Sequence, residues 1–209
     1  MYNHTLTFPS IFRGTSLQEA LRRQHLTMNT TLDEEVRRLG GKPQHDEDAY
    51  IASAIERFRA KIPQFDFDSE HIQKKPTYEQ MDGSHFVGEV VFTDRTYQAW
   101  VVTFGIPYTG NLDYLCYIPR SGFTMGGTLE LTYDRQFVYV KTWTLDRPEK
   151  DIQKIAAKRD EAIAFLQKKV ADITPELEAF NQALAREVPA LIGSLKKKYQ
   201  QDKDALANL

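Results

Sequence analysis

The sequence lacks the features that would place a chain in a specialised class. Its 209 residues include a single cysteine, Cys116, so no disulfide framework can form within the chain. No apolar run approaches the roughly 20 residues that a membrane-spanning helix needs, and the first residues lack the basic and apolar regions of a signal peptide. We therefore expect a cytoplasmic protein that does not enter the membrane.

The chain also has little net charge. The formal charge is −2 at pH 7, so the chain as a whole has no attraction for nucleic acid or anionic lipid, and any such role must rest on a local patch. Hydrophobic residues at 41% and charged residues at 27% are ordinary for globular proteins. A chain of this length buries a core without help from metals or disulfides.

Recognisable catalytic motifs are missing as well. The sequence contains no nucleophile elbow, Walker phosphate loop, dinucleotide fingerprint, helical zinc-protease motif or paired metal-binding cysteines. It also lacks the Glu-x-Lys pattern with which restriction-type nucleases hold Mg²⁺ and orient water. These absences favour a protein that is not an enzyme, and we expect neither a cofactor nor a bound metal.

The first third of the chain predicts short helices. Ser16 and Glu19 form a capping-box pattern at the start of the first helix. Thr31 is placed to begin a second helix that ends at the paired glycines 40–41, where the chain can leave helical geometry without steric cost. A third helix is expected over residues 46–62, because its apolar residues fall on one stripe. Residues 64–84 are polar and predict a connector, with a short piece at Phe65 that could pair at a sheet edge.

The middle of the chain predicts a sheet, because apolar and β-branched residues alternate there with period two. Two short Asp-Arg turns, at 94–95 and 134–135, favour antiparallel hairpins. We expect about five strands in an antiparallel meander, covering residues 86–93, 96–105, 112–118, 128–133 and 136–144. With the helices before and after it, this sheet indicates an α+β fold.

The last part of the chain predicts long helices. From Ile152 to Leu184 the apolar residues recur at alternating three- and four-residue spacings, the pattern of a coiled-coil-like seam. Pro175 and Pro189 interrupt the pattern, and a proline inside a helix costs about 3 kcal/mol. We therefore expect a helical hairpin or a kinked coiled-coil segment over residues 147–209, following a first region of residues 1–146.

The seam suggests the leading functional hypothesis. A continuous apolar stripe on a helix needs a surface to lie against, and that surface can belong to another chain. We expect a non-enzymatic assembly or sensing module whose C-terminal helices contact a protein partner or form a homo-oligomer. The candidate partner-binding residues are Ile163, Leu166, Val170, Leu177, Phe180 and Leu184.

Two alternative functions follow from polar clusters. Lys196, Lys197 and Lys198 could bind the phosphates of a nucleic acid, although cations near a helix C-terminus also complement its dipole. The cluster at 45–48, His-Asp-Glu-Asp, could hold a divalent cation together with another histidine, His71 or His85, and so serve a metal-dependent hydrolase. The same cluster is equally placed to cap the third helix, which is the interpretation we favour.

A glycine-containing loop is the last polar candidate. Residues 121–127 contain three glycines, whose backbone N–H groups could approach an anion. No lysine or helix start follows the loop, so we favour a flexible connection.

Two stretches resemble a family of bacterial proteins. Residues 104–110, Phe-Gly-Ile-Pro-Tyr-Thr-Gly, with residues 117–121, Tyr-Ile-Pro-Arg-Ser, are similar to a strand–loop–strand of that family. Residues 170–204, with Ala-Phe-Asn-Gln-Ala-Leu at 179–184, resemble its helical ending. Longer members resemble defence-associated proteins in which a restriction-endonuclease-like domain follows this region. The resemblance implies a sheet-plus-helices module in a bacterial, phage-defence setting, with catalysis in a partner protein or lost.

Overall fold

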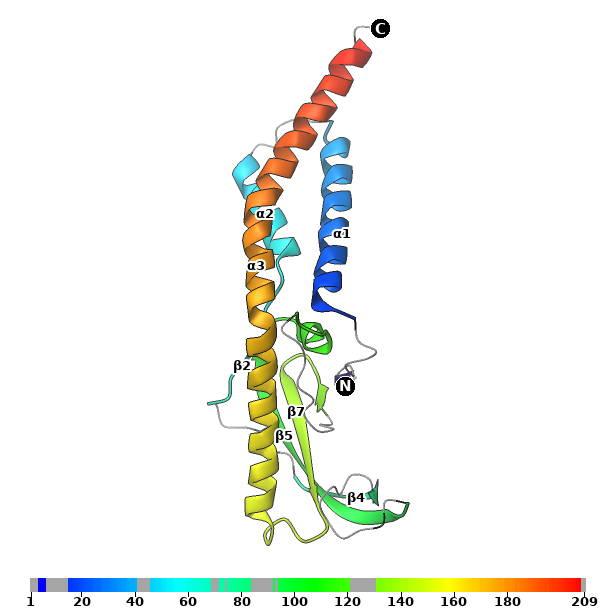
Figure 1. Cartoon of the computed structure of the whole chain (residues 1–209), viewed down its shortest axis with the longest axis vertical. Helices are drawn as coiled ribbons and strands as arrows, with labels where there is room; N and C mark the ends of the chain where they lie inside the picture. The colour runs from blue at the N-terminus through cyan, green and yellow to red at the C-terminus, as the bar shows by residue number, and fades with distance from the viewer. Residues whose placement is uncertain are drawn as a thin grey trace. The chain divides into compact units, whose positions relative to one another are not determined.

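The structure is a computed structural model that describes residues 4–6, 15–40, 46–68, 72–73, 75–83, 92, 94–120 and 131–207. It has the α+β fold that the sequence predicts (Figure 1). The chain divides into two compact units. The sheet unit comprises Met1–Phe8, Pro63–Cys116 and Thr124–Ala171, and the helical unit comprises Pro9–Ile62, Tyr117–Phe123 and Asp172–Leu209.

The sheet unit is built around one long strand, β5 (Thr96–Thr109). The described strands pair antiparallel in the order β1-β6-β7-β5-β2, and β3 and β4 also pair with β5. The other strands are β1 (His4–Leu6), β2 (Gln64–Phe65), β3 (Ile72–Gln73), β4 (Thr77–Asp82), β6 (Leu131–Tyr133) and β7 (Phe137–Thr144).

The hairpin between β6 and β7 confirms the turn predicted at residues 134–135. The Asp134 carboxylate accepts hydrogen bonds from the backbone N–H groups of Gln136 and Phe137, each at 2.9 Å. It also accepts a hydrogen bond from the Tyr139 hydroxyl at 2.7 Å. Burial, together with this bond to a carboxylate, raises the pKa of Tyr139 to about 12. One aspartate therefore fixes both the turn and the strand that follows it.

Other sheet expectations need correction. Residues 112–118 do not form a strand, because Leu112–Cys116 is the short 3₁₀ helix η2. The Asn111 side chain accepts the Asp113 backbone N–H at 3.0 Å, which turns the chain at the point where η2 begins. The predicted connector contains β3 and β4, and β4 pairs with residues 96–101 of β5. Most of the strand expected at 86–93, and the first three residues of the one expected at 128–133, lie outside the described residues.

The first part of α3 (Ile152–Ala207) belongs to the sheet unit and covers a face of the sheet. Ile155 packs with Val102 and Phe104 of β5 in a buried cluster. Further along the helix, Ala162 and Leu166 are fully buried. Apolar positions three and four residues apart therefore lie on one buried stripe, as the sequence pattern predicts.

The helical unit contains α1 (Leu17–Arg38), α2 (Glu47–Phe58) and the remainder of α3. Both predicted N-caps are confirmed: the side chains of Ser16 and Asp46 accept backbone N–H groups at 3.1 and 2.9 Å. The two helices expected between residues 16 and 40 form one helix. The hydroxyls of Thr30 and Thr31 donate to carbonyls one turn earlier, so Thr31 lies inside α1 and does not cap a new helix.

Side-chain contacts fix the helix directions within this unit. Along α1, His25 contacts Glu187 and Asp33 contacts Tyr199, so α1 and α3 run parallel. Along α2, Lys196 contacts Glu47 and Asn181 bonds the backbone at Ala60, so α2 runs antiparallel to α3. The buried core between the three helices consists of Met28, Leu32, Val36, Ala54, Leu184, Val188, Ile192 and Leu195.

The two prolines do not divide the last helix. Pro175 and Pro189 lie inside α3, which continues through both, so the hairpin expected for residues 147–209 does not form. The residues beside the prolines explain this continuity. Leu177, Val188 and Ile192 are fully buried, and their packing offsets the hydrogen bonds that the prolines cannot donate.

We predict that Leu166→Asp unfolds the sheet unit. Leu166 has 0% of its surface exposed, so the variant loses buried apolar contacts and places a carboxylate in the core. The expected loss of unfolding free energy exceeds about 4 kcal/mol. Gln167→Asp, one exposed position along the same helix, is the matched control and should change stability by less than about 0.5 kcal/mol. Equal chemical-denaturation midpoints for the two variants would contradict the assigned core.

A second prediction concerns Glu35, which joins α1 to α2. The Arg57 guanidinium bonds both its carboxylate oxygens, at 2.8 and 2.9 Å, and these bonds hold the pKa of Glu35 below its usual value. The stabilisation is therefore present above the unfolded-state pKa and is lost as the pH falls through the lower folded-state pKa. Glu35→Gln should cost about 1 kcal/mol at pH 7, because the pair is partly exposed.

The difference between the wild type and Glu35→Gln should shrink in acid, measured by urea unfolding across a pH series. Exposed Glu34→Gln is the control, and we expect it to match the wild type at every pH. If the difference in unfolding free energy between the wild type and Glu35→Gln grew as the pH fell, the folded state would not lower the pKa of Glu35 as stated above.

Candidate functional site

The helical unit contains a groove between α1 and α3, with a volume of about 430 Å³. From α1 its lining includes Gln18, Leu21, Arg22 and His25, and from α3 it includes Glu176, Ala179, Phe180, Ala183, Leu184 and Glu187. Arg120, in the segment after η2, also lines the groove. On both helices these positions recur every three or four residues, which places them on one stripe of each helix. No residue of α2 lines the groove.

The floor of the groove is apolar. Leu184 is 1% exposed and Leu21 is 7% exposed, and Phe180 is partly buried against the core. Ala179 and Ala183 also line the groove and lie about one turn apart on α3. Their methyl side chains fill little of the space between the helices. The hollow thus exists because two small residues of α3 face the first turns of α1.

Charged side chains line the edges of this floor. The His25 Nε2 and Glu187 Oε2 atoms are 2.7 Å apart and join α1 to α3. The Arg120 backbone N–H donates to the Glu176 carboxylate. Both carboxylates of the groove therefore have a partner within the chain.

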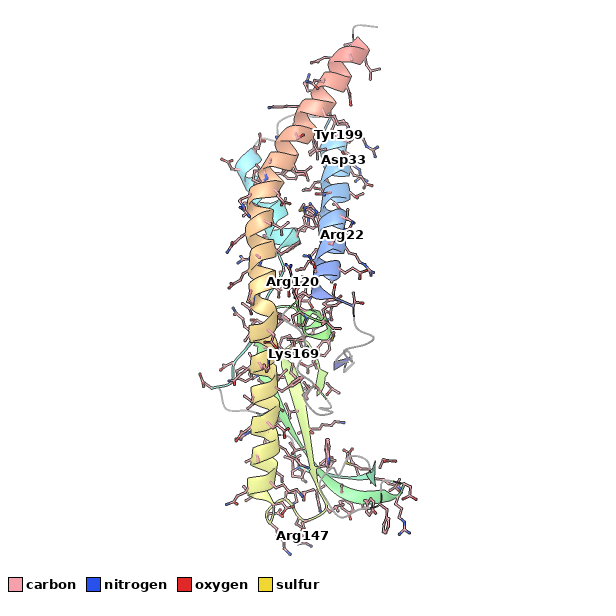
Figure 2. The ribbon with its side chains drawn as sticks, viewed as in Figure 1. Arg22, Asp33, Arg120, Arg147, Lys169 and Tyr199 are labelled. Carbon is pink, nitrogen blue, oxygen red and sulfur yellow. The ribbon has the colours of Figure 1, made fainter. Side chains whose placement is uncertain are left out.

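The guanidinium groups of the groove belong to Arg22 and Arg120, which are labelled in Figure 2. Within the described part of the chain, neither the Arg22 nor the Arg120 side chain forms an ion pair. Both residues are exposed. The groove therefore combines an apolar floor with two guanidinium groups that form no ion pair in the described residues, and guanidinium groups bind carboxylates with two parallel hydrogen bonds.

The predicted partner-binding residues of α3 have unequal exposure. Ile163, Leu166 and Val170 belong to the sheet unit, where Leu166 is fully buried and the other two are half-buried. Leu177 and Leu184 are buried in the helical unit. Phe180 is partly exposed and lines the groove. The chain itself thus covers much of the seam, and Phe180 is where the predicted surface and the groove coincide.

The lysine cluster does not form a common patch. The Lys196 ammonium pairs with Glu47 of α2 at 2.9 Å, and only 14% of that lysine side chain is exposed. The Lys198 ammonium lies 5.2 Å from the centre of the Tyr199 ring, and Lys197 is exposed. Consecutive residues of a helix point about 100° apart, so the three ammonium groups diverge. Binding of nucleic acid by these lysines stays a prediction.

The remaining polar candidates supply no site in the described residues. Asp46 caps α2 and Glu47 pairs with Lys196, whereas His45, His71, His85 and the loop 121–127 lie outside the described residues. No group of three histidine, cysteine or acidic side chains is placed to hold a metal in the part of the chain that the structure describes.

A second hollow, of about 380 Å³, lies in the sheet unit beside Phe104 and the first turns of α3. Arg159 lines it, but its guanidinium is 2.7 Å from the Asp160 carboxylate and 5.7 Å from the centre of the Phe104 ring. Among the described residues that line this hollow, none is an unpaired cation of the kind found in the α1–α3 groove.

Comparisons of this chain with models of protein families, with curated proteins and with solved structures find no match. Among the described helices, none combines the length and the apolar character needed to cross a membrane.

We predict opposite outcomes at two adjacent positions of the groove. Leu184→Ala removes fully buried contacts and should cost about 2–5 kcal/mol of unfolding free energy. Ala183→Trp places its ring in the open hollow and should change stability by less than about 1 kcal/mol. Thermal unfolding followed by circular dichroism measures both, and a large loss of stability in Ala183→Trp would show that the hollow is closed to added side chains.

Proposed function

We propose that this protein is an assembly module that binds a segment of another polypeptide in the α1–α3 groove. The observation that carries the proposal is the pairing of an apolar floor with two exposed guanidinium groups that have no ion-pair partner in the described residues. Binding sites characteristically join apolar lining to a few placed polar groups that orient the ligand. The sequence predicted a protein-binding role for the seam of α3. We assign that role to the groove, because the chain itself buries much of the seam.

The charges of the groove specify the chemistry of the partner. Glu176 and Glu187 already have partners, so the groove offers Arg22 and Arg120 to an incoming ligand. The occupant should therefore combine apolar side chains, which cover Leu21 and Phe180, with carboxylates that pair with the guanidinium groups.

A helix suits the groove better than an extended strand. The groove walls are side chains of two helices, whose backbone groups are already bonded within each helix. An extended segment would find few partners for its own N–H and C=O groups, whereas a helix satisfies them internally. The partner segment is therefore an acidic amphipathic helix that packs as a fourth helix beside α1 and α3.

The composition of the groove favours binding over covalent catalysis. His25 and Glu187 are paired as a base and an orienting carboxylate are paired in many enzymes. Among the described residues that line the groove, none has a hydroxyl, thiol or amine side chain that such a base could activate. The pair instead links α1 to α3 across the groove.

Two labelled helical peptides test this function. They share one leucine stripe and differ only in whether glutamate or lysine occupies the polar face. Fluorescence anisotropy should show binding of the acidic peptide alone, weakened by added salt because the contacts are charged and partly exposed. Ala183→Trp should abolish binding by filling the groove, and Ala185→Trp, at an exposed position of α3 outside the groove lining, is the matched control. Equal binding of both peptides, or binding that survives Ala183→Trp, would contradict the proposal.

A further inference from the structure

The end of α3 in the described residues carries an exposed helical segment, which we call the tip and define as residues 200–207. Just before the tip, the Tyr199 hydroxyl of α3 donates a hydrogen bond to the Asp33 carboxylate of α1 at 2.9 Å; both residues are labelled in Figure 2. Beyond Tyr199 every residue of the tip is exposed, and Leu206 has 71% of its surface exposed. The tip is thus a helix without a covering surface in the part of the chain that is described.

The chemistry of the tip matches that of the groove. Asp202 and Asp204 supply two carboxylates, and Leu206 supplies an exposed apolar side chain. Lys203 lies between the two aspartates, so the tip has a net charge of −1, and the Asp204 carboxylate also accepts a hydrogen bond from the Gln200 side-chain amide at 2.8 Å. The groove presents Arg22 and Arg120 above the floor formed by Leu21 and Phe180. The tip is therefore a segment of this chain that has the acidic and apolar character required of an occupant.

A tip cannot reach the groove of its own chain. Both belong to the one helix α3, and they are about twenty residues apart, which is about 30 Å at a rise of 1.5 Å per residue. The groove that a tip can enter is therefore the groove of another molecule.

We infer, on the basis of the proposed function, that the occupant of the groove is the tip of a second copy of this chain. Two copies with their α3 helices antiparallel place each tip in the groove of the other. Both contacts are then equivalent, and the assembly closes as a two-fold dimer without exposing a further groove.

Small residues lie where the two helices would cross. Midway between the groove and the tip, α3 carries Ala190, Gly193 and Ser194. Open space surrounds the position that a Cβ atom at Gly193 would occupy. Short side chains allow two helix backbones to approach closely, so this part of α3 does not hold the copies apart.

Charge reversal in separate molecules tests the inference. Asp202→Lys with Asp204→Lys makes the tip positive, and Arg22→Glu with Arg120→Glu makes the groove negative. Sedimentation analysis should show that the wild type forms a concentration-dependent dimer. The dimer dissociation constant of each variant alone should be at least about tenfold higher than that of the wild type, because like charges then face one another. An equimolar mixture of the two variants should restore the dimer, because both contacts again join opposite charges.

The substituted positions are exposed, and circular dichroism verifies that each variant retains the helical content of the wild type. Restoration in the mixture is also a control for folding, because misfolded chains would not regain a specific partner. If neither pair of charge reversals raises the dissociation constant of the dimer, the inference is overturned.

The outcomes separate this inference from the proposed function. A wild type that remains monomeric at all concentrations but binds the acidic peptide would overturn the second copy as occupant and leave the proposed function standing. A monomer that binds neither the peptide nor itself would overturn both.

Discussion

The apolar stripe of α3 has to be covered, and most of the structure follows from how the chain covers it. In the sheet unit, Ile155 lies against Val102 and Phe104 of β5. In the helical unit, Leu184, Val188 and Ile192 lie in the core shared with α1 and α2. Because these contacts bury the stripe, α3 remains one helix through two prolines that would otherwise interrupt it.

The groove exists where this covering is incomplete. On α1 the apolar positions Leu17, Leu21, Met28 and Leu32 are buried, but the turn between Leu21 and Met28 carries Gln24 and His25. Gln24 donates to the carbonyl of Phe58 at 2.7 Å, and His25 contacts Glu187. Polar links thus replace apolar packing at this level, and the small Ala179 and Ala183 of α3 leave the space that forms the groove.

Local signals in the sequence predicted the elements whose causes are local. Ser16 and Asp46 cap helices because their side chains accept nearby N–H groups, and Asp134 forms the β6–β7 turn in the same way. The prediction failed where two local choices compete. Thr31 is equally suited to cap a helix or to bond back to the preceding turn, and only the packing of α1 decides between them.

Features that depend on contacts between distant segments could not be predicted from the periodicity of the apolar residues. β3 and β4 lie in a polar segment because β4 pairs with β5 while most of its side chains stay exposed. Within the groove, Phe180 and Leu184 could be selected from their spacing along one helix. Arg22 and Arg120 could not, because no sequence pattern shows that α1 and the segment after η2 lie beside the same turns of α3.

Disulfide trapping between two different variants tests most directly whether the groove receives another chain. With Cys116→Ser as background, Ala179→Cys places a thiol in the groove and Leu206→Cys places one on the tip. If tip and groove meet, oxidation of the mixture should give chiefly the covalent dimer that joins one variant to the other. If that mixed dimer forms no more readily than dimers of either variant alone, the assembly described here is wrong.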